Sequence, residues 1–208
     1  MGSRICSTEA GALRSVLFGG PPVLIDEQYR KCVAFLYADV REEETNAIRR
    51  MPVATVFFVG VEVGSNAFVP YAVTARHVVD QSRPHGPLYA RLNLKAGGVG
   101  DLQVDADAWK THSSTDVAVA RIGAIEQADM IVIPASMLAT DDFIRDKGIS
   151  EGDDVFFTGL FNPHPGTQRN QPIVRFGNVS LMPREPLLLS PNPPISPTIK
   201  PLRVREEG

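Results

Sequence analysis

Residues 53–74 of the chain, VATVFFVGVEVGSNAFVPYAVT, contain two apolar stretches separated by a short polar break. The first stretch, 53–62, and the second, 67–74, are rich in the β-branched and aromatic residues that favour strands. The glycine, serine and asparagine at 64–66 favour a tight turn between them. The sequence therefore predicts a β-hairpin over this region.

Further short apolar segments lie on both sides of this hairpin. Residues 88–95, LYARLNLK, alternate apolar and polar side chains, which predicts a strand with one buried face. The polar stretch 40–52 predicts a long loop or one helical turn. We also expect strands over 31–39, 102–109 and 117–122. Six strands with short turns and no long amphipathic helix predict a closed or nearly closed antiparallel barrel over 29–128.

The strand pattern restarts, more weakly, after residue 129. We expect strands over 130–133, 154–161 and 172–182. Residues 134–149 predict a helix of one or two turns, capped by Thr140 or by Asp141. Residues 129–208 therefore predict a second unit with too few strands to close into a barrel.

The two ends of the chain differ from these strand-rich parts. Residues 1–28 are irregular and predict an N-terminal arm or leader. Residues 183–201 contain seven prolines, each of which removes a backbone donor, so we expect an extended surface loop there. Residues 202–205 could open one more strand.

Charge and composition exclude several classes of protein. The net charge of −3 and the pI of about 5.8 give no basic surface for nucleic acid or for an anionic membrane. No apolar run approaches the roughly 20 residues that span a bilayer, and the first residues lack a signal peptide. Cys6 and Cys32 are isolated and predict free thiols in a reducing compartment, with a single disulfide between them as the alternative. We therefore expect a cytoplasmic protein.

No pattern in the chain indicates a metal or another cofactor. The His, Cys, Asp and Glu residues lack zinc-ligand spacing, and residues 97–100 lack the lysine and the following helix of a phosphate-binding loop. Three histidines, His85, His112 and His164, are expected to be solvated loop residues.

The fourth histidine has a more informative context. In residues 71–79, YAVTARHVV, a strand runs into small residues and then reaches His77 at the start of a helical turn. An imidazole at the end of a rigid strand can be exposed on one edge and fixed on the other, as catalysis requires. Ala75 leaves room for a neighbouring group beside the ring.

An acidic residue opens the apolar segment at 117–122. Strand alternation places Asp116, Ala118 and Ala120 on one face of that segment. A carboxylate at the mouth of an apolar strand needs a partner, and an imidazole N–H is a suitable one. Such a hydrogen bond fixes the histidine tautomer and stabilises the imidazolium.

These two segments together resemble the trypsin-like (chymotrypsin-superfamily) serine peptidases. The family pattern T-A-x-H is matched by residues 74–77, and D-hydrophobic-A by residues 116–118, with the histidine before the aspartate and the two 39 positions apart. Residues 151–163 and 175–182 resemble the second barrel of the family. The resemblance covers about residues 31–182 and is closest to bacterial-type members with few disulfides.

The resemblance implies a chymotrypsin-like double β-barrel and hydrolysis of peptide bonds in a peptide or protein substrate. His77 is then the general base and general acid, Asp116 orients it, and a serine in a G-x-S-G context is the nucleophile. The sequence departs from the family here, because no G-x-S-G occurs in its 208 residues. Ser180 lies in a predicted strand, and Ser190 and Ser196 lack flanking glycines.

Two hypotheses follow from this departure. In the first, the chain is part of a serine endopeptidase: a fragment, a prematurely ended reading frame or a degenerate relative that lacks the nucleophile. In the second, the chain is a non-catalytic β-barrel interaction module or pseudo-peptidase. Under both hypotheses, we expect the 208-residue chain by itself to have no hydrolytic activity.

Overall fold

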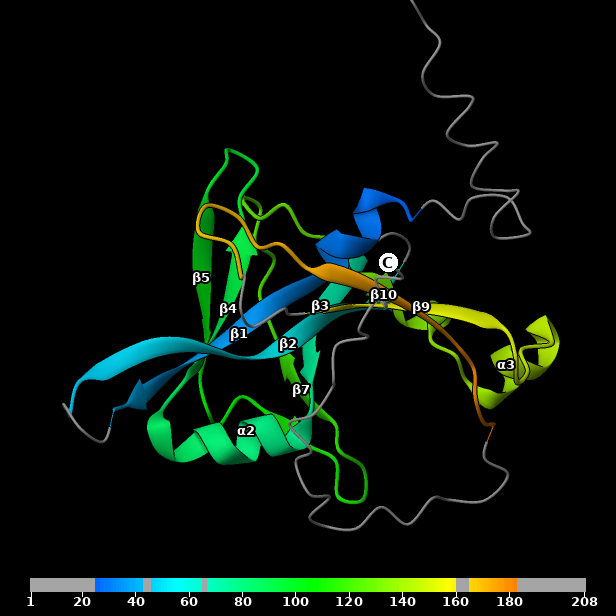
Figure 1. The fold of residues 1–208 in the computed structure, drawn as a ribbon, viewed down its shortest axis with the longest axis horizontal. Coiled ribbons are helices and arrows are strands. Elements are labelled where there is room, and N and C mark those ends of the chain that lie inside the picture. The colour runs from blue at the N-terminus through cyan, green and yellow to red at the C-terminus, as the bar shows by residue number, and fades with distance from the viewer. Residues whose placement is uncertain (1–24, 43–45, 65–66, 160–164, 183–208) are drawn as a thin grey trace, which may run out of the picture.

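The computed structural model describes residues 25–42, 46–64, 67–159 and 165–182. Most of the regular structure in these ranges is antiparallel β-sheet, which confirms the all-β class (Figure 1). Several predictions lie outside the described residues: most of the N-terminal arm, the proline-rich segment, the strand over 202–205, and the surroundings of Cys6 and His164.

The main sheet contains eight of the described strands: β1 (Val33–Arg41), β2 (Ile48–Val63), β3 (Ala67–Thr74), β4 (Leu88–Asn93), β5 (Val99–Val104), β6 (Lys110–Thr111), β7 (Ala118–Arg121) and β8 (Ile133–Pro134). Their order is β5-β4-β1-β2-β3-β7-β6, and β8 pairs in parallel with β2. All the other pairings in this sheet are antiparallel. A second sheet consists of β9 (Asp154–Gly159) and β10 (Ile173–Asn178).

The helices in the described residues are short: η1 (Glu27–Cys32), α2 (Arg76–Ser82), η2 (Arg83–His85), η3 (Ala135–Met137) and α3 (Asp141–Lys147). None of them has the length and apolar character needed to cross a bilayer. The capped helix predicted after residue 134 is confirmed as α3. The Thr140 hydroxyl accepts a hydrogen bond from the Phe143 N–H at 3.3 Å, and Gly148, with φ of 66°, ends the helix.

The hairpin predicted over 53–74 is confirmed, and β3 has the predicted bounds. The prediction of a loop over 40–52 is wrong at both ends of that segment, because β1 extends to Arg41 and β2 begins at Ile48. Together they form a long ribbon that projects from one side of the molecule (Figure 1). The Arg50 guanidinium lies 2.9 Å from the Asp39 carboxylate on the facing strand and 3.4 Å from the centre of the Tyr89 ring. These cross-strand contacts stabilise polar strands whose local sequence resembles a loop.

The main sheet does not close into a barrel through a hydrogen-bonded ladder. Its two edge strands, β5 and β6, do not pair with each other in the described part of the chain. Only residues 105–109 separate these two strands in sequence. The strand predicted over 102–109 ends early, at Val104, and strand structure resumes at Lys110. Trp109 in this connection is 2% exposed and belongs to the core. A single chain segment thus joins the two edges of the sheet.

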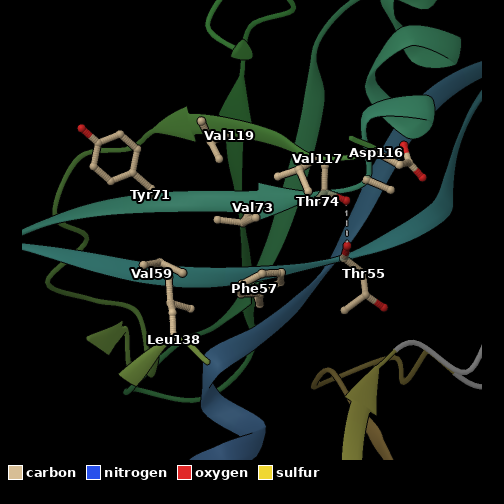
Figure 2. Close-up of a pocket in the computed structure, with 11 residues that line it drawn as sticks. Thr55, Phe57, Val59, Tyr71, Val73, Thr74, Asp116, Val117, Val119 and Leu138 are labelled. Atoms are coloured by element: carbon tan, nitrogen blue, oxygen red, sulfur yellow. Dashed lines mark hydrogen bonds between the residues drawn. The ribbon is translucent and has the colours of Figure 1, made fainter. Parts of the chain in front are cut away.

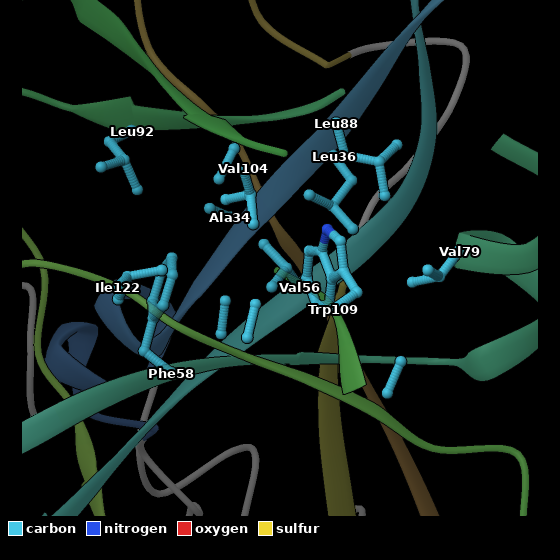
Figure 3. Packing of buried hydrophobic residues seen from close by; sticks show 14 of the residues in the cluster. Ala34, Leu36, Val56, Phe58, Val79, Leu88, Leu92, Val104, Trp109 and Ile122 are labelled. Atoms are coloured by element: carbon cyan, nitrogen blue, oxygen red, sulfur yellow. The ribbon is translucent and has the colours of Figure 1, made fainter. Parts of the chain in front are cut away.

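Buried side chains of the main sheet, such as Leu36, Val56 and Leu88, pack together with Trp109 to form the core (Figure 3). In β4 every second residue is buried, which confirms the half-buried strand predicted from its sequence. Strand β1 is buried on both faces over Ala34–Ala38, and on the neighbouring β4 the Asn93 side chain accepts a hydrogen bond from the Asn170 N–H at 2.7 Å. Arg91 on β4 donates hydrogen bonds to the carbonyl of Gly166 at 2.8 Å and to the Tyr37 hydroxyl at 3.0 Å.

The chain after residue 129 contributes to both sheets. The strand predicted over 130–133 is displaced to Ile133–Pro134, where β8 extends the main sheet. The strand predicted over 172–182 is shorter, because β10 ends at Asn178. The β9–β10 hairpin leaves large apolar side chains exposed: Val155, Phe156, Phe157 and Phe176. Phe156 contacts the Tyr29 ring, with 5.6 Å between centroids.

Candidate functional site

His77 lies immediately beyond the end of β3. The Thr74 hydroxyl, on the last residue of this strand, donates a hydrogen bond to the Thr55 carbonyl on β2 at 2.9 Å, which fixes the strand end. Ala75 is extended, with φ of −72° and ψ of 139°, and α2 begins at Arg76. The imidazole therefore leaves the backbone one turn beyond a rigid strand, as the sequence predicts.

Strand pairing brings Asp116 to the same end of the sheet. Strands β3 and β7 are antiparallel, and Thr74 is paired with Ala118. His77 follows Thr74 in the chain and Asp116 precedes Ala118, so both residues lie beyond the same end of the paired strands. Asp116 is outside β7, which starts at Ala118, rather than being its first residue.

The two side chains form a hydrogen-bonded dyad. The His77 Nδ1 and the Asp116 Oδ2 are 2.6 Å apart, and the His77 backbone N–H donates to Asp116 Oδ1 at 2.8 Å. Because an ionised carboxylate only accepts hydrogen bonds, the neutral imidazole carries its proton on Nδ1. The Nε2 lone pair is then available to take a proton from another group. The two side chains are 59% and 54% exposed, so the site is open to solvent.

The dyad also sets the charge of the carboxyl group. The backbone N–H of His77 is the main cause that lowers the pKa of Asp116, and the hydrogen bond and charge of the His77 ring act in the same direction. Partial burial opposes them. Asp116 is therefore ionised at neutral pH and remains an acceptor for the imidazole.

Comparison of the chain with protein-family models, curated proteins and solved structures gave no match. The chemistry of this site is therefore argued from the dyad and from the residues around it.

The loop that carries Asp116 has its own hydrogen-bond network. Arg76 Nη1 donates to the carbonyls of His112 and Ser113 at 3.1 and 3.2 Å. The His112 Nδ1 accepts from the backbone N–H groups of Ser114 and Thr115 at 3.3 and 3.1 Å. His112 is exposed in a loop, as expected, but nothing in the local sequence assigns these contacts to its ring. Arg76 was likewise only the variable position of the T-A-x-H pattern.

An apolar groove of about 560 Å³ begins beside Asp116 (Figure 2). Its walls include Phe57 on β2, Val73 on β3 and Val119 on β7, which point away from the core side of the main sheet, and Leu138 after η3. The groove thus runs along the outer face of the three strands that position the dyad.

No nucleophile accompanies the dyad within residues 25–42, 46–64, 67–159 and 165–182: no serine hydroxyl or cysteine thiol there hydrogen-bonds to the His77 ring. Cys32 is 8% exposed, and burial raises the pKa of its thiol, which disfavours the reactive thiolate. Ser180 lies beyond the end of β10, not within a strand as predicted, and its hydroxyl donates to the Asn178 carbonyl at 3.4 Å. Ser190 and Ser196 lie outside the described residues.

The described residues also bring no three His, Cys, Asp or Glu side chains together in the manner of a metal site. His85, at the end of η2, is exposed and distant in sequence from the Asp116 loop. The described arrangement at His77 consists of a solvent-accessible base, an ionised carboxylate that orients it and an adjacent apolar groove.

Proposed function

We propose that this chain carries the base and the orienting carboxylate of a trypsin-like serine endopeptidase. The observation that carries the proposal is the 2.6 Å contact between His77 Nδ1 and Asp116 Oδ2, with the carboxylate also held by the His77 N–H. Two residues that the family pattern selects, 39 positions apart, meet in the geometry that the chemistry requires.

The proposed reaction is hydrolysis of a peptide bond in a peptide or protein substrate. His77 Nε2 takes the proton of a serine hydroxyl as its oxygen attacks the scissile carbonyl, and then gives that proton to the leaving amine. Asp116 keeps the proton of the neutral ring on Nδ1 and stabilises the imidazolium between these steps. The exposure of the ring allows the serine and the substrate to reach Nε2.

The fold proposed for this activity is a chymotrypsin-like double barrel with an incomplete second barrel. In support, residues 105–109 join the edge strands β5 and β6 of the main sheet, so its two edges lie no further apart than this short connection can span, although no ladder closes them. Residues 29–128 then form the first barrel, which carries the dyad. Residues 129–208 belong to the second, of which the β9–β10 hairpin is part.

The proposal requires a nucleophile that the dyad does not have among the described residues. Because no G-x-S-G occurs in the 208 residues either, we propose that the serine belongs to another segment of the peptidase, and we expect the chain alone to be inactive. Tests of the dyad consequently need the product of the complete reading frame that contains this chain.

The test is labelling of that product by a fluorophosphonate, which reacts with a serine activated by a neighbouring base. We expect labelling of the wild type, and a labelling rate reduced about 10³- to 10⁴-fold in the His77→Ala and Asp116→Asn variants. His85→Ala, which removes an exposed histidine elsewhere, is the matched control and should label like the wild type. The isolated 208-residue chain should not label.

The alternative is a non-catalytic interaction module or pseudo-peptidase. It is favoured by the apolar groove beside a dyad without a nucleophile. Absence of labelling in the product of the complete reading frame, or equal labelling of the wild type and His77→Ala, would contradict the peptidase and support this alternative. Labelling of the isolated chain that depends on His77 would contradict the external serine.

A further inference from the structure

The carboxylate of the dyad lies on a loop with few apolar contacts to hold it. Residues 112–116 are all exposed, and Asp116 is not part of β7. An exposed loop of this kind gains little from burial, so its conformation depends on hydrogen bonds. Two side chains, Arg76 and His112, supply most of those bonds.

Arg76 connects α2 with the first half of the loop. Its Nη1 contacts two successive carbonyls, those of His112 and Ser113, and its Nε donates to Asp80 one turn later on α2 at 3.1 Å. A planar guanidinium can make these contacts at the same time, because its donors point in fixed directions. Arg76 is also adjacent in the chain to His77, so one side chain ties the helix that carries the base to the loop that carries the carboxylate.

His112 organises the second half of the loop. The ring Nδ1 of His112 accepts hydrogen bonds from the backbone N–H groups of Ser114 and Thr115. The backbone N–H of His112 donates to the Val117 carbonyl at 2.9 Å. This arrangement resembles an Asx turn, in which a side-chain oxygen accepts from amides two residues further along. Because Nδ1 accepts, the neutral ring must carry its proton on Nε2.

We propose that Arg76 and His112 are positioning residues that hold Asp116 against His77. Arg76 fixes the loop to α2, and the His112 ring fixes the turn that leads to Asp116. This inference rests on the proposed function, because a positioned carboxylate matters only if His77 acts as a base. Neither residue contacts a reacting atom, so both act through Asp116.

The first test needs no substitution. Correlation of ¹⁵N and ¹H resonances across the imidazole rings reports which nitrogen carries the proton in each histidine. At a pH where the rings are neutral, we expect His112 to carry it on Nε2 and His77 to carry it on Nδ1. A proton on Nδ1 of His112 would overturn the role assigned to its ring.

The second test follows the His77 backbone amide, which donates to Asp116. Its proton resonance and its hydrogen-exchange rate report whether the carboxylate is in place, with Asp116→Ala as the reference for its loss. We expect Arg76→Gln and His112→Ala to shift the resonance toward that reference and to accelerate exchange about tenfold, as for the loss of one charge-assisted hydrogen bond.

Two further variants separate positioning from a general loss of structure. His112→Asn keeps an acceptor where Nδ1 lies and should restore the wild-type His77 amide resonance. Arg83→Gln removes an equal charge from an exposed position just after α2 and should leave it unchanged. The proposal would be overturned if the His77 amide resonance and exchange rate were unchanged in both Arg76→Gln and His112→Ala. It would also be overturned if His112→Asn failed to restore the wild-type resonance.

These measurements report the place of the carboxylate and do not require a nucleophile. They can therefore succeed in a chain that has no peptidase role, and they can fail in a chain whose complete form labels with a fluorophosphonate. Failure of the positioning proposal and failure of the proposed function are distinguished in this way.

Discussion

The main sheet and the β9–β10 hairpin are built from similar sequences but differ in what covers them. In the main sheet, aromatic and aliphatic residues such as Phe58 and Val56 are 1% and 0% exposed. In the hairpin, Phe157 and Phe176 are 56% and 62% exposed. An apolar strand therefore does not by itself supply a core, since the free energy comes from the surface that its partners cover.

The location of the dyad follows from this difference. His77 and Asp116 both lie at the end of the well-packed main sheet, where the pairing of β3 with β7 fixes their separation. Strand β9 contacts this sheet at β1, and no described residue of the hairpin is hydrogen-bonded to the dyad. Packing in the main sheet thus determines the geometry of the site, and the hairpin is less constrained.

The largest expected difference in unfolding free energy comes from replacing a phenylalanine by alanine in each of the two regions. Phe58→Ala removes a fully buried ring and should lower the free energy of unfolding by about 3–5 kcal/mol. Phe176→Ala removes an exposed ring and should change it by less than about 1 kcal/mol. Urea denaturation of the two variants measures both values. Equal losses would show that the hairpin has a core partner in solution.

A smaller contrast comes from two glycines. Gly166 has φ of 84°, and a Cβ there would overlap the carbonyl of Arg169, in the loop that accepts a hydrogen bond from Arg91. Gly166→Ala should therefore destabilise the protein by about 1–3 kcal/mol. Gly177 on β10 has no positive φ, and a Cβ there would contact no other atom. Gly177→Ala should therefore be neutral or slightly stabilising. Thermal unfolding of the pair gives the comparison, and a neutral Gly166→Ala would contradict it.

The smallest expected effect is the contribution of Asp116 to the pH dependence of stability in acid. The pKa of Asp116 is lower in the folded chain than its unfolded value of about 3.9, so its pairing stabilises the fold above that pH. This contribution is lost as the pH falls through the folded pKa. Because both partners are more than half exposed, it should be below about 1 kcal/mol. Asp116→Asn should flatten the fall in stability between neutral and acidic pH, and identical pH profiles would contradict the assignment.

Local sequence determined the elements whose causes lie within a few residues. The alternation in 88–95, the apolar stretches of the β2–β3 hairpin and the Thr140 cap of α3 were each predicted and found. His77 and Asp116 were selected by short patterns, and the structure brings them together. In each case the deciding property, such as side-chain alternation or a capping hydroxyl, belongs to the segment itself.

Tertiary structure alone decided the features that depend on residues far apart in the chain. Residues 40–41 and 48–52 are strand because Asp39, Arg50 and Tyr89 meet across the sheet, although the local composition favours a loop. The edges of the main sheet are joined by a connection rather than paired, which no periodicity reports. The contacts of Arg76 and His112 exist only because β3 and β7 pair and bring α2 against the Asp116 loop. Long-range pairing creates these contacts, and a pattern read along a single segment contains no information about its partner.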